Sequence, residues 1–210
     1  MIRKELAGVP RPHRLSGVRS VPRSFFAADS RDLAPLLLNK LLARGDRVGR
    51  IVEVEAYAGA ADPASHAFRG RTARNDTMFG PPGHLYVYFT YGMHFCANVV
   101  CGEDGEASAV LMRALPAVAG LEEMRAARGP AARLDRDLCS GPGKLCQALG
   151  LDRSFDGADL VTGDRGVTVL DDGTPPPAEP GVSGRVGLSV AAEVPWRFYV
   201  PGAVGLSRSR

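Results

Sequence analysis

Hydrophobic and polar positions alternate most clearly between residues 49 and 115. Residues 49–57, Gly-Arg-Ile-Val-Glu-Val-Glu-Ala-Tyr, follow a period of two, which predicts a strand with two unlike faces. We expect one face to point toward the core and the other to carry two carboxylates and a phenol. The first face comprises Val52, Val54 and Ala56, and the second comprises Ile51, Glu53, Glu55 and Tyr57.

Three further strands are predicted after this one, at residues 85–89, 94–100 and 107–115. The first two are joined by a Thr-Tyr-Gly turn, and glycine accepts the positive φ that a tight hairpin requires. The run therefore predicts an antiparallel meander with Tyr91 at a hairpin tip. A large aromatic side chain gains little from burial at a tip, so it serves contact or is covered by another loop.

Helical spacing of leucines predicts a first helix over residues 30–44, with Ser30 as its N-cap and Gly45 at its end. The remaining predicted elements are helices at 120–128 and 140–150, loop-rich chain at 155–184, and strands at 185–190 and 196–200. Helices that surround an antiparallel meander are typical of the α+β class.

The chain has 210 residues, enough for one substantial core, and it shows neither an internal repeat nor a linker. We therefore expect one domain at residues 23–205, between a basic flexible arm at 1–22 and a basic tail at 206–210. Basic residues in the arm are mixed with Pro, Gly and Ser, so the arm serves either solubility or loose contact with a polyanion.

The composition disfavours several classes of protein. No run of about 18 apolar residues is present, so we expect no membrane span. The N-terminus lacks the apolar core of a signal peptide, and we expect an intracellular protein. The four cysteines form no Cys-x-x-Cys pair and there are only four histidines, so we expect reduced thiols, no metal and no cofactor. The net charge of +3 is too small to identify a partner.

Glu55 beside Tyr57 is the first candidate for chemistry, because a carboxylate next to an aromatic ring on a rigid strand suits a general base. The long segment that follows, residues 58–82, is rich in arginine and carries His66 and Arg74. A basic loop beside a carboxylate suggests an anionic substrate. The alternative is a solvated strand face paired with basic side chains, and the strand taken alone favours this alternative.

A second candidate lies at the start of the helix predicted at 140–150. Ser140 can cap this helix, and the free amide groups of its first turn form an anion site together with Lys144. The spacing differs from that of a Walker loop, so the sequence does not predict a nucleoside triphosphate.

Several phrases, taken in order, resemble the alkyladenine (3-methyladenine) DNA glycosylase family. They include Val-Glu-Val-Glu-Ala-Tyr at 52–57, Leu-Tyr-Val-Tyr at 85–88, Tyr-Gly-Met at 91–93, Leu-Met-Arg-Ala-Leu at 111–115, Cys-Ser-Gly-Pro at 139–142, Lys-Leu-Cys-Gln-Ala-Leu at 144–149 and Arg-Phe-Tyr-Val at 197–200. The resemblance implies a single α+β domain with a curved antiparallel sheet and surrounding helices. It also implies hydrolysis of the N-glycosidic bond of an alkylated or deaminated purine, without metal or cofactor.

The resemblance implies roles for individual residues around the scissile bond. Glu55 would deprotonate a water for attack at the sugar C1′, and Arg113 would help to hold that water. The residues expected around the flipped base are Tyr57, His66, Tyr88 and Asn98. Asn98 would clash with the 2-amino group of guanine and so favour adenine-like bases.

The resemblance also implies a DNA-binding face. Tyr91 would fill the space that a flipped nucleotide leaves in the duplex. Contacts to the DNA backbone are expected from Arg74, Ser140 and Lys144. The expected partner is double-stranded DNA that contains a damaged purine, bound by a monomer.

Two positions depart from the family pattern: His94 replaces an aromatic residue, and Gly143 replaces a small hydroxyl at the helix start. Two other functions also stay open. A non-catalytic nucleic-acid binder would lack the acid Glu55, and a sugar glycosidase would use Glu53 with Glu55 as its pair. Because those two side chains point from one face rather than flanking a bond, we expect Glu53 to be structural.

Overall fold

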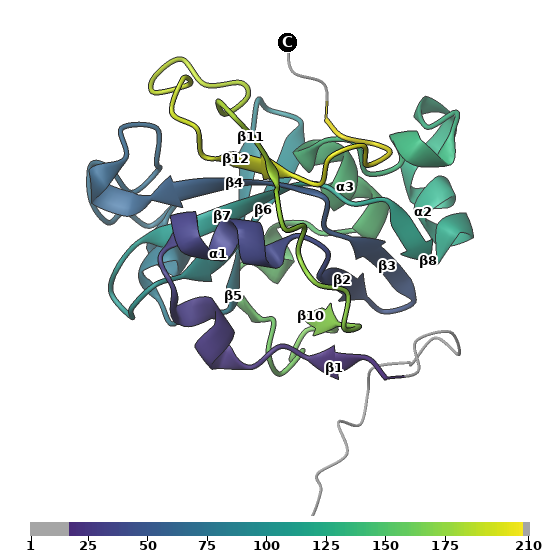
Figure 1. The fold of residues 1–210 in the computed structure, drawn as a ribbon, viewed down its shortest axis with the longest axis horizontal. Coiled ribbons are helices and arrows are strands. Elements are labelled where there is room, and N and C mark those ends of the chain that lie inside the picture. Colours follow the sequence, from purple (N-terminus) through teal and green to yellow (C-terminus); the bar gives the residue numbers. More distant parts are fainter. Residues whose placement is uncertain (1–16, 208–210) are drawn as a thin grey trace, which may run out of the picture.

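The computed structural model describes residues 17–207, in which helices pack around two antiparallel sheets (Figure 1). The five-stranded sheet has the order β1 (Arg19–Ser20), β10 (Val167–Asp171), β2 (Leu41–Arg44), β3 (Arg47–Arg50) and β8 (Ala117–Ala119). The seven-stranded sheet has the order β11 (Gly181–Ser183), β12 (Arg197–Tyr199), β4 (Glu53–Ala58), β7 (Ser108–Ala114), β6 (His94–Cys101), β5 (His84–Thr90) and β9 (Ala158–Asp159).

The helices of this region are α1 (Ser30–Leu37), α2 (Leu121–Arg128) and α3 (Pro142–Leu149). Short 3-10 helices lie at η1 (Arg23–Ala27), η2 (Gly59–Ala61), η3 (Asp76–Phe79), η4 (Gly129–Ala131), η5 (Asp135–Asp137) and η6 (Arg153–Phe155). Between residues 17 and 207, none of the helices has the length and apolar character that crossing a bilayer requires. The elements confirm the predicted α+β class, with the strands divided between two sheets.

The predicted meander is confirmed in the centre of the larger sheet, where β4, β7, β6 and β5 are successive antiparallel neighbours. The β5–β6 hairpin closes with Thr90 opposite His94. Its turn places Tyr91 and Gly92 at φ angles of 51° and 67°. Tyr91 therefore stands at the hairpin tip, as the alternation predicted.

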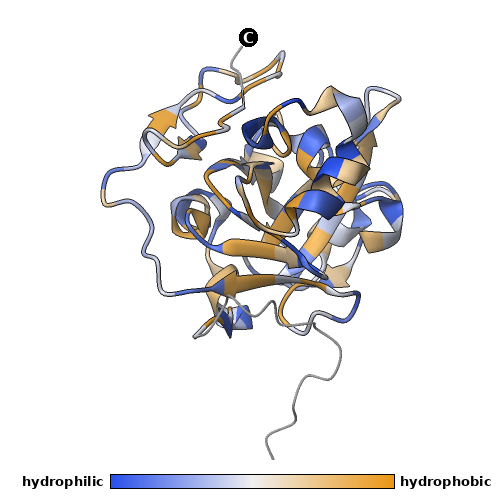
Figure 2. Cartoon of the chain, turned by 90° about the vertical axis from the view of Figure 1, so that its right-hand side faces the viewer, coloured by the Kyte–Doolittle hydropathy of each residue, from blue (hydrophilic) through white to orange (hydrophobic). Residues whose placement is uncertain are grey.

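The main core lies on one face of the seven-stranded sheet, beneath α1 and α3. Leucines of both helices join one buried cluster with alternate residues of four strands. Those strand residues are Val54, Ala56, Leu85, Val87, Ala97, Val99, Val110 and Met112. In Figure 2 the strands carry much of the hydrophobic colour, while the outer turns of the helices are hydrophilic. Because strand side chains alternate, the intervening residues point to the opposite face of the sheet.

The helix predicted at residues 30–44 is wrong beyond Leu37. The chain turns at Asn39, whose φ is 69°, and then forms β2, which pairs with both β10 and β3. A run of leucines fits a buried strand as well as a helix, and its partner β10 lies in chain that reads as loop. The N-cap is Asp29 rather than Ser30, since the Asp29 carboxylate accepts the Arg31 N–H at 2.9 Å.

The single strand predicted at residues 49–57 is two strands in different sheets. The chain leaves β3, crosses at the buried residue Ile51, and enters the larger sheet at Glu53. The pairing of β4 with β7 shifts by a bulge between Glu53 and Val54. Ile51 therefore belongs to the core rather than to the face that carries Glu55.

The last predicted elements have mixed outcomes. The helices at 120–128 and 140–150 are confirmed as α2 and α3, and the strand at 196–200 is confirmed as β12. The strand predicted at 185–190 is wrong, because this segment has no ladder partner and its Arg185 is held in a buried ion pair instead. Ser140 does not cap α3, whose N-cap is Gly141.

The structure adds detail near both predicted boundaries of the domain. β1 lies within the segment expected as an arm at 1–22, and it pairs with β10. Val21, also in that segment, is buried, while residues 1–16 and 208–210 fall outside the described residues. Ser207, expected in the tail, is buried and hydrogen-bonded to the carboxylate of Glu53.

Candidate active site

In the larger sheet, the register aligns one side chain from each of four neighbouring strands in a row across the sheet. Glu55 on β4 pairs with Leu111 on β7. Leu111 pairs with Asn98 on β6, and Asn98 pairs with Tyr86 on β5. Paired residues share a face of a sheet, so these side chains point away from α1 and α3. The tyrosines two residues further along β4 and β5 join the same face.

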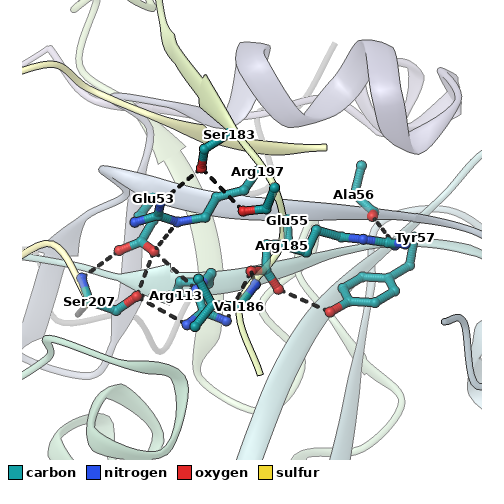
Figure 3. A network of polar contacts seen from close by, with 11 residues as sticks. Glu53, Glu55, Ala56, Tyr57, Arg113, Ser183, Arg185, Val186, Arg197 and Ser207 are labelled. Atoms are coloured by element: carbon teal, nitrogen blue, oxygen red, sulfur yellow. Dashed lines mark hydrogen bonds and ion pairs between the residues drawn. The ribbon is translucent and has the colours of Figure 1, made fainter. Parts of the chain in front are cut away.

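Glu55 is fully buried, and its carboxylate is surrounded by donors (Figure 3). Oε1 accepts the Val186 N–H at 2.7 Å and lies 3.2 Å from Nη1 of Arg113. Oε2 accepts the Tyr57 hydroxyl at 2.9 Å. All three partners donate, so they suit an ionised carboxylate and orient it rigidly.

Tyr57 stays protonated in this arrangement. Burial raises the pKa of Tyr57 well above its usual value of 10.0, and the neighbouring Glu55 carboxylate raises it further. The guanidinium of Arg185 lies 4.8 Å from the centre of the Tyr57 ring. The phenol therefore acts as a fixed donor to Glu55, while one ring face is held by a cation.

Glu53 differs sharply from Glu55, although both lie on β4. Its Oε1 accepts Nε of Arg113 at 3.0 Å, Nε of Arg197 at 2.8 Å and the Ser207 hydroxyl at 2.6 Å. Its Oε2 accepts the Ser207 N–H at 2.6 Å. Burial alone would raise the pKa of Glu53, but the hydrogen bonds from Ser207 and Arg197 and the charge of Arg113 lower it. This carboxylate is enclosed in a structural cluster.

An aromatic pocket lies beside Glu55 on the same face. Its lining residues are Tyr57, Ala64, His66, Met78, Tyr86, Tyr88, Asn98 and Leu188. Its cavity volume is about 60 Å³, and the pocket opens to solvent. Asn98 donates its side-chain amide to the carbonyl of Tyr86 at 3.3 Å, which fixes the amide in the pocket wall.

Three rings form the far wall of this pocket. The rings of Tyr86 and Tyr88 stack with their centres 5.4 Å apart, and His66 meets Tyr88 edge-on at 4.4 Å. Nδ1 of His66 lies 3.1 Å from the Tyr86 hydroxyl. Burial lowers the pKa of His66 below 6.5, and the charge of Arg74 lowers it further, so the imidazole is neutral at neutral pH. Burial raises the pKa of Tyr86 to about 12.

The hairpin tip forms an exposed apolar ridge above the pocket strands. Tyr91 is 79% exposed and Met93 is 68% exposed, which is unusual for such side chains. The guanidinium of Arg74 lies 5.8 Å from the centre of the Tyr88 ring and donates to the Phe89 carbonyl at 3.4 Å. The structure thus places Arg74, one of the residues predicted to contact the DNA backbone, against the hairpin that carries Tyr91.

The other two residues predicted to contact the DNA backbone, Ser140 and Lys144, lie at the start of α3. Nζ of Lys144 donates to Oγ of Ser140 at 3.0 Å. Both line a cavity of about 470 Å³, which is also lined by Arg113, Arg136, Asp137, Gly141, Pro142, Gly205, Leu206 and Ser207. The helix start for which an anion site is predicted therefore lines a polar cavity, and that cavity is also lined by Arg113 and Ser207, the partners of Glu53.

The two departures from the family pattern lie against each other. A Cβ placed on Gly143 would lie 2.9 Å from Cγ and 3.1 Å from Cβ of His94. Atoms that close would have to move, so a larger residue at position 143 would displace the His94 imidazole next to the hairpin tip. No local pattern indicates that these two positions, 49 residues apart in the chain, lie against each other.

Sequence reasoning missed four residues near the pocket: Asp62, Tyr86, Arg185 and Val186. Tyr86 could have been found, since it shares the period-two face of Tyr88. Arg185 and Asp62 form a fully buried ion pair, and an arginine inside the apolar run at 185–190 was the available signal. The amide of Val186 carries no sequence signal. Within residues 17–207, no group of three or more His, Cys, Asp or Glu side chains is arranged to hold a metal ion.

The sequence matches the family model described as methylpurine-DNA glycosylase over residues 24–204. A relative from Burkholderia lata is 58% identical over 87% of this chain and 88% of its own length. Relatives from Streptomyces avermitilis and Koribacter versatilis are 50% and 43% identical, over 85% and 93% of this chain and 86% and 97% of their own lengths. All three carry the provisional name 3-methyladenine DNA glycosylase. The resemblance seen in the sequence is confirmed: the chain belongs to the methylpurine-DNA glycosylase family.

Proposed function

We propose that this protein draws a damaged purine out of duplex DNA and hydrolyses its N-glycosidic bond, leaving an abasic site. The supporting observation is the buried Glu55 carboxylate, held by three donors beside a wall of stacked rings. A carboxylate locked in an outer-surface ion pair would contradict the proposal, and Glu55 is neither exposed nor distant from the rings.

The hydrogen bonds of Glu55 favour Oε2 as the oxygen that holds the attacking water. Oε1 of Glu55 already has Val186 and Arg113 as partners, whereas Oε2 has the Tyr57 hydroxyl alone. A carboxylate oxygen accepts two hydrogen bonds, so Oε2 has one acceptor site left for a water. Oε2 of Glu53 also has a single donor, so the count alone does not separate the two glutamates. The partners of Glu53 are Arg113, Arg197 and Ser207, none of which lines the aromatic pocket, whereas Glu55 is bonded to the pocket residue Tyr57. This difference argues against Glu53 as the base.

The proposed reaction is a hydrolysis in which water adds at C1′. Glu55 takes a proton from the water as its oxygen bonds to C1′, and the C1′–N bond breaks with its electron pair going to the purine. The anionic carboxylate also stabilises the positive charge that develops on the sugar. A ring-alkylated purine carries a positive charge and leaves as a neutral base, so the enzyme needs no further acid for it.

The pocket rings provide faces for the extruded base. Tyr57, Tyr88 and the neutral imidazole of His66 are electron-rich, and a cationic purine is attracted to such faces. Asn98, fixed against the Tyr86 carbonyl, would oppose the 2-amino group of guanine. This arrangement favours alkylated adenines and extends to hypoxanthine-like bases.

Extrusion requires that the duplex be held and its gap filled. Unstacking a base costs a few kcal/mol, and a wedge in the vacated space offsets part of that cost. Tyr91 at the exposed tip suits this role, and the exposed Arg74, from the segment 58–82, contacts the same hairpin at the Phe89 carbonyl. Lys144 and Ser140 provide a second contact to the DNA backbone at the start of α3.

The test is incubation of the protein with duplexes that each contain one lesion: 3-methyladenine, hypoxanthine, ethenoadenine or 7-methylguanine, of which 7-methylguanine should be released most slowly because it carries the 2-amino group. We expect strand breaks only after alkali treatment, since an abasic site without lyase cleavage is alkali-sensitive. Glu55→Gln is the matched control and should bind the damaged duplex without releasing the base. A wild-type protein that binds these duplexes and releases no base would support the non-catalytic binder instead.

A further inference from the structure

We propose that Asp62 and Arg185 form a positioning pair that holds the Val186 amide on the carboxylate of Glu55. The inference rests on the proposed function, because it assigns these residues to the rate of base excision. Neither side chain reaches the attacking water or the base. Their effect would pass through the hydrogen bond that Val186 makes with Glu55.

The pair joins two irregular segments that carry opposite sides of the pocket. Oδ1 of Asp62 accepts Nη2 of Arg185 at 2.8 Å, and Oδ2 accepts Nη1, so the contact is a two-pronged fork. Asp62 precedes the pocket residue Ala64, whose N–H it also accepts at 3.0 Å. Arg185 precedes the pocket residue Leu188 by three positions.

Arg185 is anchored on the strand that carries the general base. Its Nη1 donates to the carbonyl of Ala56 at 3.0 Å, directly between Glu55 and Tyr57 in the chain. Its guanidinium lies 4.8 Å from the Tyr57 ring and 5.1 Å from the Trp196 ring. Figure 3 shows the Arg185 side chain alongside Ala56 and Tyr57, with Val186 next to the Glu55 carboxylate.

The Val186 amide depends on this anchor. Residues 184–196, between β11 and β12, contain no helix or strand to fix the backbone. Val186 nevertheless places its N–H 2.7 Å from Oε1 of Glu55. With Arg185 held at three points, the adjacent peptide group has little freedom. Loosening the pair would let the amide leave Oε1 and let the carboxylate turn away from the water position.

Stability alone does not explain the pair. Replacing a buried ion pair with apolar residues is often neutral or stabilising, because both charges must be taken out of water. Among the residues described, Nε of Arg185 has no hydrogen-bond acceptor although it is buried, which adds to that cost. A positioning role accounts for a costly pair at this place.

The experiment compares Arg185→Gln, Asp62→Asn and the double variant with the wild type. The measured quantities are the single-turnover excision rate at saturating enzyme, normalised to active fraction, and the affinity for the damaged duplex. Arg50→Gln is the control, because Arg50 makes a similar fork with Asp172 on the other sheet, at 2.6 and 3.4 Å. Trp196 is the single tryptophan of the chain, so its emission reports on the guanidinium beside it.

Loss of one charge-assisted hydrogen bond to Glu55 predicts a rate decrease of about 10- to 100-fold in each single variant. Duplex affinity should stay within about 3-fold, since Arg185 is 4% exposed and cannot reach DNA. The double variant should be no slower than the slower single variant, because both remove the same pair. Asp62→Asn should shift the Trp196 emission by releasing Arg185. Arg50→Gln should lower the melting temperature and leave the rate unchanged.

Two results would overturn the inference while leaving the proposed function intact. One is an unchanged single-turnover rate in variants that only melt earlier, which would make the pair structural. The other is a double variant whose fold-loss in excision rate equals the product of the two single fold-losses, which would mean that the two residues act independently. If Arg185→Gln fails to fold, Arg185→Lys keeps the charge but not the fork, and its rate should fall in the same direction. A wild type that releases no base from any lesion would overturn both proposals.

Discussion

Replacing each of two neighbouring glutamates by glutamine should give opposite results. Glu53→Gln removes the buried carboxylate charge that pairs with Arg113 and Arg197 and accepts hydrogen bonds from Ser207. Breaking such a buried ion pair costs about 3–5 kcal/mol. For a chain of this length each kcal/mol corresponds to about 2–4 °C in melting temperature, so we expect a decrease of roughly 6–20 °C. Folded Glu53→Gln enzyme should keep an excision rate within about 10-fold of the wild type, because Glu55 retains its donors.

Glu55→Gln should lose about 10²- to 10⁴-fold in single-turnover rate, the range for a general base. Its melting temperature should change less than that of Glu53→Gln, since Arg113 keeps its bond to Glu53. The assay pairs thermal melting with single-turnover excision from one lesion duplex, at enzyme concentrations above the dissociation constant. Equal rate losses in the two variants would refute the assignment of the base. A larger rate loss in Glu53→Gln would reverse it.

The pH dependence of stability provides an independent check on Glu53. Its hydrogen bonds and the charge of Arg113 lower its pKa from 4.5 in the folded protein. A depressed carboxyl pKa contributes stability that is fully present above pH 4.5 and is lost as pH falls through the folded value. The difference in melting temperature between wild type and Glu53→Gln should therefore be largest near neutral pH and shrink below pH 4.5. A difference that grows on acidification would contradict the lowered pKa.

Three further predictions concern the rim of the pocket. Tyr91→Ser should leave the melting temperature unchanged, because the side chain is 79% exposed, and should weaken capture of the flipped base in a 2-aminopurine fluorescence assay. Arg74→Gln should move the His66 titration measured by NMR part of the way back toward 6.5, since burial remains the larger cause of its lowered pKa. Gly143→Ser should lower the melting temperature in the wild type and do so less in a His94→Ala background, because its Cβ needs the space of the imidazole.

The elements that the sequence predicted well are those whose signal is local. The meander from β5 to β7 and the tip at Tyr91 follow from alternation and a Gly turn, and α2 and α3 follow from short helical patterns. The helix predicted over residues 38–44 is wrong because a run of leucines fits both a helix and a strand. Pairing with β10 decides for the strand, and Leu41 pairs there with Leu170, 129 residues further along the chain. No local pattern carries such long-range pairing.

The candidate site likewise has one part that a local sequence pattern predicts and another part that depends on residues far apart in the chain. Period two placed Glu55 and Tyr57 on one face and Tyr88 on the equivalent face of β5, and the sheet register then brought those faces together. The sequence could not show which of Glu53 and Glu55 is enclosed by donors. That difference depends on Arg197 and Ser207, which lie 144 and 154 residues further along the chain.

The walls of the aromatic pocket differ in how far they can adjust to an entering base. Some of them come from strands of the larger sheet and others from irregular segments. Tyr57, Tyr88 and Asn98 stand on hydrogen-bonded strands of the sheet and are poor candidates for movement. His66 and Leu188 stand on irregular segments, which open at lower free energy than a sheet does. Because those two segments are joined by the fork between Asp62 and Arg185, we expect this one pair to link movement of the pocket wall to the position of the Val186 amide.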